Sequence, residues 1–517
     1  MLTPFMNEAI NLFQSPTEVE EMKRAIAFVN SNLGKEYDLI VGGERVKTQK
    51  KLKSINPADK SELVGVVNLA SQELAERAIS IAYDTYESLW RNFDPYARAR
   101  ILLKAAAIMR KRKFELSAWM VVEIGKSWIE AVADTAEAID FLEFYARAMM
   151  GYAGAQKVEA FPGEENSFYW MPLGVIVVIP PWNFPNAILT GMTAAALVTG
   201  NTVVLKPASI TPIIAAKVME IFEEAGLPKG VLNYLPGSGG EVGDYIVEHP
   251  KTRMIAFTGS KEVGIRINER AAKVVKGQKW LKRVIAEMGG KDTMVVDEDV
   301  DLDAAARDIV AGAFGFQGQK CSANSRVVAM ESVSEKLVAK VKELSEKLKI
   351  GDPRERENTL GPVSSESAFD SIMRYIEIGK KEATLVSGGE ALSPEKGYFI
   401  KPTIFKNVKP SAVISQEEIF GPVISFLKAK SFKEAIAIAN DTEYGLTGGV
   451  YSNNREHLEY ARREFFVGNL YFNRKITGAL VGVQPFGGFN MSGTDSKAGG
   501  KEYLTLFMQA KTVTERF

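Results

Sequence analysis

The sequence predicts an α/β protein of two or three domains, in which parallel sheets carry helices on both faces. One observation is the sequence pattern after residue 175. Short β-rich runs such as "VIVVI", "TVVL" and "RMIAFTG" alternate there with helical stretches, which would form the crossover connections between parallel strands. The other is size: 517 residues, 46% hydrophobic and 25% charged, can bury large cores in an ordinary soluble protein. In sheets of this kind, ligands bind beyond the carboxyl ends of the strands.

The segments before residue 150 are expected to be mostly helical. Residues 1–38 indicate a polar, mostly helical arm, and "YDLIVGGERVKTQ" after them is typical of a β-hairpin. In "RARILLKAAAIMRKRKFEL", apolar residues recur at helical spacing with basic residues opposite, which predicts an amphipathic helix with a solvated charged face. The apolar positions are Leu102, Ala105, Ala106 and Met109.

Five turns follow the strands expected between residues 175 and 290: "PPWNFP", "KPAS", "PGSGG", "FTGS" and "EMGGKD". Because parallel strands end at the same edge of a sheet, we expect these turns to lie along one edge. Two of them approach familiar phosphate-binding signatures without completing one. "GSGGEVG" lacks the last glycine of G-x-G-x-x-G, and "GSKEVG" lacks the Lys-Ser/Thr of a P-loop. The sheet is therefore nucleotide-like, but neither a standard dinucleotide fold nor an NTPase.

A second α/β stretch begins near residue 291. A strand at "DTMVVDE", a helix through "DLDAAARDIVAGAFG" and a strand at "SRVVAM" are predicted, and the next helix is expected to start at a capping box formed by Ser332 and Glu335. Further βα alternation runs to about residue 472. The long Gly-rich segment "NRKITGALVGVQPFGGFNMSG" then predicts a functional loop.

Charge and cysteine content exclude several classes of protein. Lys+Arg and Asp+Glu both count 64, so no net charge attracts nucleic acid or an anionic membrane, and small-molecule partners are expected. One cysteine excludes an internal disulfide, and His249 and His457 are too far apart for a Cys/His zinc cluster, so we expect no metal. The start of the chain lacks the pattern of a secretory signal, and we expect a cytoplasmic protein.

Residues 166–205 carry no charge, which by length alone would permit a membrane span. "PPWNFP" interrupts this stretch near its middle, and its apolar ends "VIVVI" and "TVVL" are typical of short buried strands. We interpret the stretch as part of the sheet.

The only cysteine, Cys321, stands in "FQGQKCSANS". A free cysteine is more often a small buried hydrophobe. Here its polar and glycine neighbours are typical of a partly exposed pocket, which favours a reactive thiol. Lys320 is a candidate to lower the thiol pKa, although adjacent side chains often point apart.

Eight motifs, in this order, resemble those of the NAD(P)-dependent aldehyde dehydrogenase superfamily: "PWNFP", "KPAS-x-TP", "FTGS-x-x-VG", "EMGGKD", "GQKCSA", "EEIFGPV", "YGLTGG" and "PFGGFNMSG". The resemblance covers roughly residues 40–517. "GFQGQKCSA", "NLYFNRKITGALVGVQPFGG" and the N-terminal arm further resemble the subfamily that oxidises L-glutamate γ-semialdehyde, formed from 1-pyrroline-5-carboxylate, to L-glutamate in proline and arginine catabolism.

The resemblance implies an aldehyde-dehydrogenase-like α/β fold with a Rossmann-like nucleotide-binding domain, an α/β catalytic domain and a small oligomerisation hairpin. The implied divisions are a helical arm (1–38), the nucleotide-binding domain (39–148 and 167–286), the catalytic domain (287–475) and oligomerisation or bridging elements (149–166 and 495–517). It also implies a homodimer or a larger homo-oligomer of dimers. NAD is the expected cofactor, with NADP as a secondary one.

The expected chemistry explains the lone thiol. An aldehyde has no leaving group except hydride, so a nucleophile must first add to its carbon, and the Cys321 thiolate suits that step. The product is a thiohemiacetal, which becomes a thioester. By resemblance, the Asn183 amide and the Cys321 backbone N–H stabilise the oxyanion, and Glu287 is the base that activates water. Without the motifs, Asn183 would be interpreted as a turn residue and Glu287 as a salt-bridge partner.

The same resemblance assigns the remaining site residues. The implied cofactor contacts are Lys206 and Ser209 at the adenosine ribose, Gly237 and Gly259 for close backbone approach, Ser260 at the pyrophosphate, and Glu418 and Phe420 at the nicotinamide end. The implied substrate contacts are Ser322, Gly478 and Ala479 at the carboxylate, with Phe184 and Phe486 beside the aliphatic part. As bare aromatics, the two phenylalanines are more often core residues.

Two alternatives stay open. One is a dehydrogenase for another aldehyde, either a semialdehyde without the amino group or betaine aldehyde, and a carboxylate-binding loop disfavours the cationic substrate. The other is a non-catalytic binding protein on the same fold, which the joint presence of Cys321, Asn183 and Glu287 disfavours.

Overall fold

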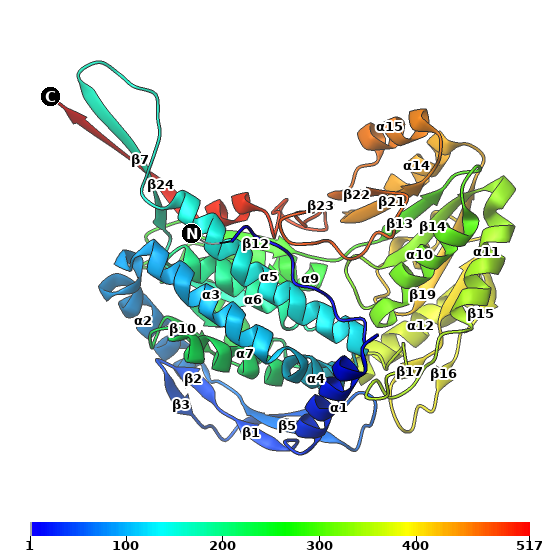
Figure 1. The fold of residues 1–517 in the computed structure, drawn as a ribbon, viewed down its shortest axis with the longest axis horizontal. Coiled ribbons are helices and arrows are strands. Elements are labelled where there is room, and N and C mark those ends of the chain that lie inside the picture. The colour runs from blue at the N-terminus through cyan, green and yellow to red at the C-terminus, as the bar shows by residue number, and fades with distance from the viewer. Residues whose placement is uncertain (1–2) are drawn as a thin grey trace.

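The computed structural model describes residues 3–517, and two seven-stranded sheets dominate it (Figure 1). The first sheet has the order β12-β11-β8-β9-β10-β2-β3, in which β12 to β10 are parallel and β2 and β3 form an antiparallel hairpin at the edge. We call the part built on this sheet the first lobe. Its strands are β2 (Leu39–Val41), β3 (Glu44–Val46), β8 (Val175–Ile179), β9 (Thr202–Leu205), β10 (Leu232–Tyr234), β11 (Thr252–Thr258) and β12 (Arg283–Glu287).

The second sheet has the order β15-β18-β19-β14-β13-β21-β22, and every neighbouring pair except β15 with β18 is parallel. We call the part built on it the second lobe. Its strands are β13 (Asp292–Val296), β14 (Asn324–Met330), β15 (Thr384–Ser387), β18 (Thr403–Lys406), β19 (Val423–Ala429), β21 (Thr447–Tyr451) and β22 (Asn469–Phe472). The small sheets comprise β1 (Lys35–Tyr37), β4 (Lys51–Ile55) and β5 (Leu63–Asn68); β16 (Ala391–Leu392) and β17 (Phe399–Ile400); β20 (Tyr444–Gly445) and β23 (Phe489–Asn490); and β6 (Ala155–Gln156), β7 (Glu164–Pro172) and β24 (Met508–Arg516).

Helices cover both sheets. Those of the first lobe and the arm are α1 (Pro16–Asn30), α2 (Gln72–Ser88), α3 (Pro95–Lys111), α4 (Lys113–Ile124), α5 (Trp128–Tyr152), α6 (Ala187–Val198), α7 (Pro212–Ala225), α8 (Asp244–Glu248) and α9 (Lys261–Ala272). Those of the second lobe are α10 (Leu302–Phe314), α11 (Glu331–Ser345), α12 (Glu366–Glu382), α13 (Val413–Gln416), α14 (Phe432–Asn440) and α15 (Arg455–Glu464). Four short turns of helix are η1 (Trp90–Asn92), η2 (Gly239–Gly243), η3 (Gly315–Gly318) and η4 (Lys501–Phe507).

The strands of the first sheet are apolar on both sides because each side faces a core. In β8, Val175 and Val177 belong to one buried cluster, whereas Ile176 and Val178 belong to the other. Successive side chains of a strand point to opposite faces, so a continuous apolar run is what a doubly covered sheet requires. The uncharged stretch 166–205 is thus β7, β8, α6 and β9 with their connections. Among residues 3–517, no helix is long and apolar enough to cross a membrane.

Two helix predictions have different outcomes. The amphipathic helix is α3, and its four apolar positions are all buried, as predicted. The solvated charged face is only partly correct, because Arg98 and, just after α3, Lys113 are buried and donate to the carbonyl oxygens of Val198 and Ala9. The capping box at Ser332 is wrong. Helix α11 already begins at Glu331 with Met330 as its N-cap, because β14 runs directly into the helix, and Glu335 instead pairs with Lys406 and Lys428.

The last strand, β24, forms a long hairpin-like ribbon with β7. Nine residue pairs join them, from Met508 opposite Pro172 to Arg516 opposite Glu164. Figure 1 shows this ribbon projecting from the first lobe, with the C-terminus at its tip. In the three-stranded sheet β24-β7-β6, strand β24 lies at the edge, and its residues after Met508 are exposed.

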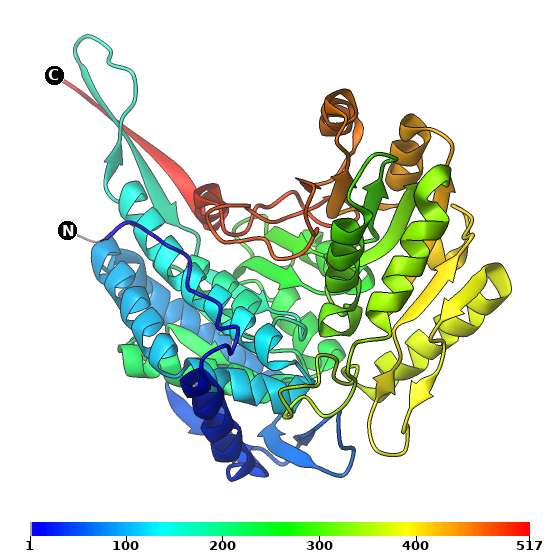
Figure 2. The same cartoon turned by 45° about the vertical axis from the view of Figure 1, so that its right-hand side comes forward.

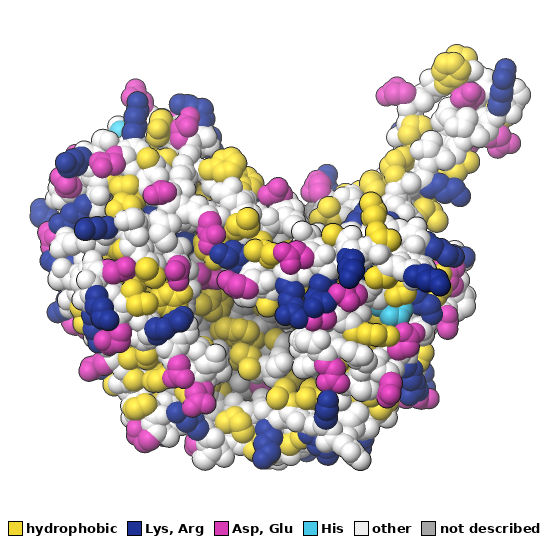
Figure 3. All heavy atoms as spheres, turned by 180° about the vertical axis from the view of Figure 1, so that it is seen from behind, with side chains coloured by type: hydrophobic (Ala, Val, Ile, Leu, Met, Phe, Trp, Pro, Cys, Tyr) yellow, Lys and Arg dark blue, Asp and Glu magenta, His cyan; other side chains and the backbone are white. Residues whose placement is uncertain are grey.

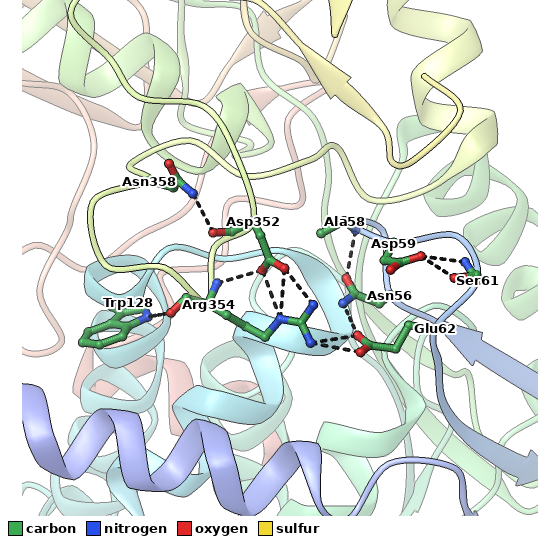
Figure 4. Close-up of polar contacts among 9 residues, drawn as sticks. All are labelled: Asn56, Ala58, Asp59, Ser61, Glu62, Trp128, Asp352, Arg354 and Asn358. Atoms are coloured by element: carbon green, nitrogen blue, oxygen red, sulfur yellow. Dashed lines mark hydrogen bonds and ion pairs between the residues drawn. The ribbon is translucent and has the colours of Figure 1, made fainter. Parts of the chain in front are cut away.

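The two lobes are connected by the chain and by a polar network. Only residues 288–291 separate β12 from β13, so the carboxyl edge of the first sheet meets the amino edge of the second. Elsewhere, the Arg354 guanidinium pairs with Asp352 (2.7 Å) and with Glu62 (3.0 Å), and the Arg354 carbonyl oxygen accepts a 3.2 Å hydrogen bond from Trp128 Nε1 (Figure 4). This network joins the turn after β4 to the segment between α11 and α12.

Candidate active site

The loop that carries Cys321 has an unusual backbone. Phe316, Gln317 and Gly318 have φ values of 48°, 56° and 68°, so three successive residues are left-handed. A side chain at Gly318 would collide with the Gly421 carbonyl oxygen, which explains the glycine. Buried amides hold the loop: Gln317 Nε2 donates to the Pro362 carbonyl oxygen (2.8 Å), and Gln319 Oε1 accepts from the Ser364 backbone N–H (2.8 Å). The loop thus places Cys321, half-buried, just before β14.

Asn183 reaches this loop from the turn after β8. Its side chain is buried, and Nδ2 donates a 3.1 Å hydrogen bond to the Gln319 carbonyl oxygen. The amide carries a second hydrogen, which this bond does not use. Asn183 therefore contacts the cysteine loop at Gln319, two residues before Cys321 in the sequence. This position is compatible with the predicted role as oxyanion donor.

Glu287 is the last residue of β12 and is buried. The Ser496 hydroxyl donates a hydrogen bond to its Oε1, whereas Oε2 has no partner among residues 3–517. Burial raises the pKa of Glu287 to about 8, and the hydrogen bond from Ser496 opposes that rise. A carboxyl group with this pKa is suited to accept a proton near neutral pH.

Electrostatics at the thiol differ from the expectation. Burial, followed by the charges of Asp292, Glu418 and Glu287, raises the pKa of Cys321 well above its usual value. Lys320 does not lower it, because its ammonium points to Glu130, with 2.7 Å between the charged atoms. The suggested activation by Lys320 is therefore wrong, and the resting thiol needs a base to lose its proton.

Glu418 is a second carboxyl group near the thiol. Its Oε1 accepts a 2.9 Å hydrogen bond from the Gly290 backbone N–H, and burial raises the pKa of Glu418 to about 7. A side chain at Gly290 would collide with the Cys321 carbonyl oxygen, and one at Gly289 would collide with the Glu418 carboxylate, so these two glycines make room for the cysteine loop and for Glu418. Phe420 adopts φ 55° and packs edge-on against Trp182, with 5.3 Å between ring centroids.

Five of the seven expected cofactor residues, all except Glu418 and Phe420, lie just after the carboxyl ends of β9, β10 and β11. Lys206 follows β9 and is buried, burial lowers its pKa to about 8, and no carboxylate of residues 3–517 pairs with it. Ser209 is exposed nearby. Ser260 caps α9, where its hydroxyl accepts from the Val263 N–H (3.4 Å). A buried ammonium that no described carboxylate pairs with fits an anionic ligand such as a dinucleotide.

Contacts within the chain explain why glycine occupies the two expected cofactor positions, Gly237 and Gly259. A Cβ on Gly237 would lie 2.7 Å from the Val242 side chain, and one on Gly259 would lie 2.6 Å from the Phe257 ring. Neighbouring side chains therefore already exclude larger residues at both positions, whatever the cofactor contacts.

The expected substrate residues fall into two groups. Ser322 and Phe184 adjoin Cys321 and Asn183, and Ser322 is buried. The other three lie on the loop 473–500. Gly478 (φ 76°) is exposed, Ala479 is half-buried, and the Phe486 N–H donates a 2.8 Å hydrogen bond to the Ala498 carbonyl oxygen. The same loop carries Ser496, the partner of Glu287.

Two buried charged residues beneath the site escaped the sequence analysis. Lys126 and Asp134 are completely buried and form an ion pair of 2.7 Å. Asp134 also accepts a 2.6 Å hydrogen bond from the Ala187 N–H at the start of α6, and the Lys126 ammonium lies 4.2 Å from the Phe184 ring centroid. No motif marks them: Lys126 lies in the short connection between α4 and α5, Asp134 lies on α5, and charged residues at this spacing are common on protein surfaces.

A recess opens beside the cysteine loop. Its lining includes Gly290, Gly318, Asn324, Glu418 and Phe420. Seen from behind, the surface is hollowed between the two lobes, and apolar side chains lie in the hollow (Figure 3). No group of three or more His, Cys, Asp or Glu side chains in the described part of the chain is arranged to hold a metal ion.

Comparisons with known proteins agree with this geometry. A family model described as "Aldehyde dehydrogenase family" matches residues 45–513. The "1-pyrroline-5-carboxylate dehydrogenase" of Geobacillus sp. (strain WCH70) is 60% identical over 517 residues, which are 100% of both chains. A solved 1-pyrroline-5-carboxylate dehydrogenase from Thermus with bound NAD has a TM-score of 0.98 at 53% identity, covering 100% of both chains. A Staphylococcus aureus betaine aldehyde dehydrogenase in complex with NAD+ has a TM-score of 0.89 at 29% identity, covering 96% of this chain and 97% of that one.

Proposed function

Because the chain belongs to the aldehyde dehydrogenase family, we propose that it oxidises L-glutamate γ-semialdehyde to L-glutamate with NAD, and with NADP as a secondary cofactor. One observation carries the proposal. Cys321, Asn183 and Glu287 come from three distant segments and meet where the carboxyl edge of the first sheet faces the amino edge of the second. A nucleophile, an oxyanion donor and a base are the three groups that aldehyde oxidation through a thioester needs.

The first half of the reaction is addition and hydride loss. The Cys321 sulfur forms a bond to the aldehyde carbon, and the thiol proton passes to a base. Since the pKa of the thiol is raised, a neighbouring carboxylate must take this proton, and Glu287 is close enough to contribute to that rise. The free hydrogen of the Asn183 amide stabilises the oxyanion of the thiohemiacetal. Bound NAD supplies the acceptor for the hydride, which leaves the same carbon.

The second half is hydrolysis of the thioester. Glu287 first passes the proton that it took from the thiol to solvent. It then removes a proton from water, the water oxygen bonds to the thioester carbon, and the carbon–sulfur bond breaks to release the acid. The proton held by Glu287 returns to the Cys321 sulfur, which restores the thiol. Oε2 of Glu287 is the oxygen without a protein partner, so it is the one free to face that water.

Substrate choice would come from the residues expected to bind the substrate carboxylate, which are Ser322, Gly478 and Ala479. Ser322 is buried beside the thiol, and the exposed backbone at Gly478 and Ala479 offers further N–H donors. Donors left unpaired by an aldehyde without a carboxylate carry a large penalty. This favours the semialdehyde over betaine aldehyde, in line with the 60% identity to an enzyme named for 1-pyrroline-5-carboxylate and the 29% identity to one named for betaine aldehyde.

The experiment follows NADH formation after mixing the enzyme with NAD and an aldehyde. We expect kcat/KM for glutamate γ-semialdehyde to exceed that for propanal, hexanal or betaine aldehyde by at least about a hundredfold. Cys321→Ala should abolish oxidation while NAD binding, followed by fluorescence titration, stays near the parent value. Equal kcat/KM for the semialdehyde and propanal would refute the substrate assignment, and steady-state turnover in the alanine variant would refute the role of the thiol.

The exposed ribbon of β7 and β24 supports a second copy of this chain as a partner. An edge strand with unpaired backbone groups and no cover is a site for strand addition. We propose a homodimer, alone or within a larger homo-oligomer of dimers, in which β24 is covered. Removal of residues 508–517 should then halve the mass measured by light scattering, and an unchanged mass would exclude this ribbon as the interface.

A further inference from the structure

The N-terminal arm reaches the loop that carries the proposed substrate carboxylate site. Figure 2 shows the segment before α1 running as an extended chain across the helices of the first lobe. Residues 3–14 form no helix, although the sequence predicted a mostly helical arm. This segment is nevertheless held closely. The Thr3 carbonyl oxygen accepts from Arg147 Nε (3.2 Å), the Ala9 carbonyl oxygen accepts from Lys113 Nζ (2.6 Å), and Phe13 is buried against Trp128.

Asn7 is the contact that matters for the site. One hydrogen of its side-chain amide is donated to Asp140 Oδ2 on α5 (2.8 Å), and the other to the Val481 carbonyl oxygen (3.0 Å). Asp140 is buried, and its second oxygen accepts from the Glu8 backbone N–H (2.6 Å). Asn7 therefore ties a rigid helix to a carbonyl two residues beyond Ala479.

Phe5 makes a second, apolar contact with the same loop. Its ring packs edge-on against Phe144 of α5, with 5.2 Å between centroids. Gly482 lies against both rings: a Cβ added there would be 2.9 Å from Phe144 and 3.3 Å from Phe5. Gly482 also has φ 77°, so the loop needs a glycine here both for its backbone and for the aromatic contact.

The loop itself is a compact turn at this point. The Leu480 N–H donates to Gln484 Oε1 (2.9 Å), and the Gly482 N–H donates to the Gly499 carbonyl oxygen (2.8 Å). The Gly499 N–H in turn donates to the Tyr145 hydroxyl of α5 (2.8 Å). Movement at Val481 would be passed through Leu480 to the backbone of Ala479 and Gly478, which lie two and three residues before it.

We propose that Asn7, supported by Phe5, is a positioning residue that sets the orientation of the carboxylate-binding backbone at Gly478 and Ala479. The inference rests on the proposed function, since it concerns the same substrate. A positioning residue of this kind affects recognition of the substrate carboxylate and leaves the chemistry at the thiol unchanged.

The test compares two aldehydes in three variants. Asn7→Ala should lower kcat/KM for glutamate γ-semialdehyde roughly three- to tenfold, the range for one lost hydrogen bond, mainly through KM. Values of kcat/KM for propanal, which has no carboxylate, and of KM for NAD should stay within about twofold. Asn7→Asp, which replaces both donors by acceptors facing Asp140 and the Val481 carbonyl, should lower the semialdehyde value further.

Met6→Ala is the matched control, because Met6 is the neighbouring residue on the same segment and is 83% exposed. It should behave as the parent enzyme with both aldehydes. An Asn7→Ala enzyme with parent kinetics for the semialdehyde, or with equal losses for both aldehydes, would overturn the proposal. A parent enzyme without preference for the semialdehyde would instead overturn the proposed function, so the two failures are distinguishable.

Discussion

The side-chain amide of Asn183 donates a 3.1 Å hydrogen bond to the carbonyl oxygen of Gln319, 136 residues further along the chain. This bond holds the amide in place before any substrate arrives, and it leaves the second amide hydrogen free. A donor that is already oriented costs no reorganisation when the oxyanion forms.

Asn183→Ala should therefore lower kcat by about 10²–10³, the usual effect of removing one oxyanion donor. KM for NAD should change little. Stopped-flow measurement of the first NADH produced would locate the loss in the step before hydride departure. A variant with kcat within threefold of the parent would show that Asn183 only orders the cysteine loop.

Turnover should depend on pH through Glu287. Burial raises the pKa of Glu287 to about 8, and the base is active only when it is ionised. Activity should therefore rise with pH, reach half of its maximum near pH 8 and level off roughly one to two pH units higher. Glu287→Gln should give a first burst of NADH and then stall at the thioester, which rapid mixing would reveal. Steady turnover at the parent rate in this variant would contradict the assignment.

The variant Ser496→Ala tests the role of Glu287 without changing Glu287 itself. The Ser496 hydroxyl donates to Glu287 and so lowers the pKa of that carboxyl relative to its buried, unbonded state. Without this hydrogen bond, the pKa of Glu287 rises, and the midpoint of the pH–activity profile should move to higher pH. A midpoint that stays in place would mean that another group controls the profile.

The Lys126–Asp134 pair should be important for stability. Both side chains are completely buried, so removal of one partner leaves an uncompensated charge in the protein interior. Lys126→Met or Asp134→Asn should lower the free energy of unfolding by about 3–5 kcal/mol, measured by denaturant titration. The double variant should recover part of the loss, because it buries no charge. If the single and double variants lose the same free energy of unfolding, Lys126 and Asp134 do not stabilise the protein as a pair.

Cofactor choice should respond to Ser209. This residue is exposed near the buried Lys206, and it cannot repel a 2′-phosphate. Ser209→Glu should weaken NADP by about 1–3 kcal/mol through like-charge repulsion while sparing NAD. Ser209→Gln is the neutral control of similar size. If the parent enzyme already rejects NADP as strongly as the glutamate variant, Ser209 is not the discriminating residue.

The strands of the sheets, the candidate nucleophile and the class of reaction could be predicted without the structure. "VIVVI" and "TVVL" indicated strands buried on both faces, and Val175 and Ile176 indeed enter opposite cores. Local patterns suffice for such elements because side-chain direction repeats every two residues in a strand. Cys321 was identifiable because it is the only cysteine in the chain. The individual cofactor and substrate contacts, and the domain bounds, stay predictions.

Where local reasoning failed, distant partners were the cause. Lys320 is next to Cys321 in sequence, yet its ammonium lies against Glu130, 190 residues away. Residues 1–38 were expected to form a mostly helical arm, yet residues 3–14 form no helix, and their backbone and side chains bond to α3, α4 and α5. Ser332 and Glu335 have the spacing of a capping box, but the strand before them runs straight into the helix.

The environment of the reacting groups depends on contacts between segments far apart in the sequence. Ser496 meets Glu287 across 209 residues, and Asn7 meets Val481 across 474. Contacts of this kind form when the lobes pack and long loops close, so neither composition nor periodicity contains a signal for them. The same packing removes water from Glu287 and Cys321, and this desolvation raises the pKa of both groups.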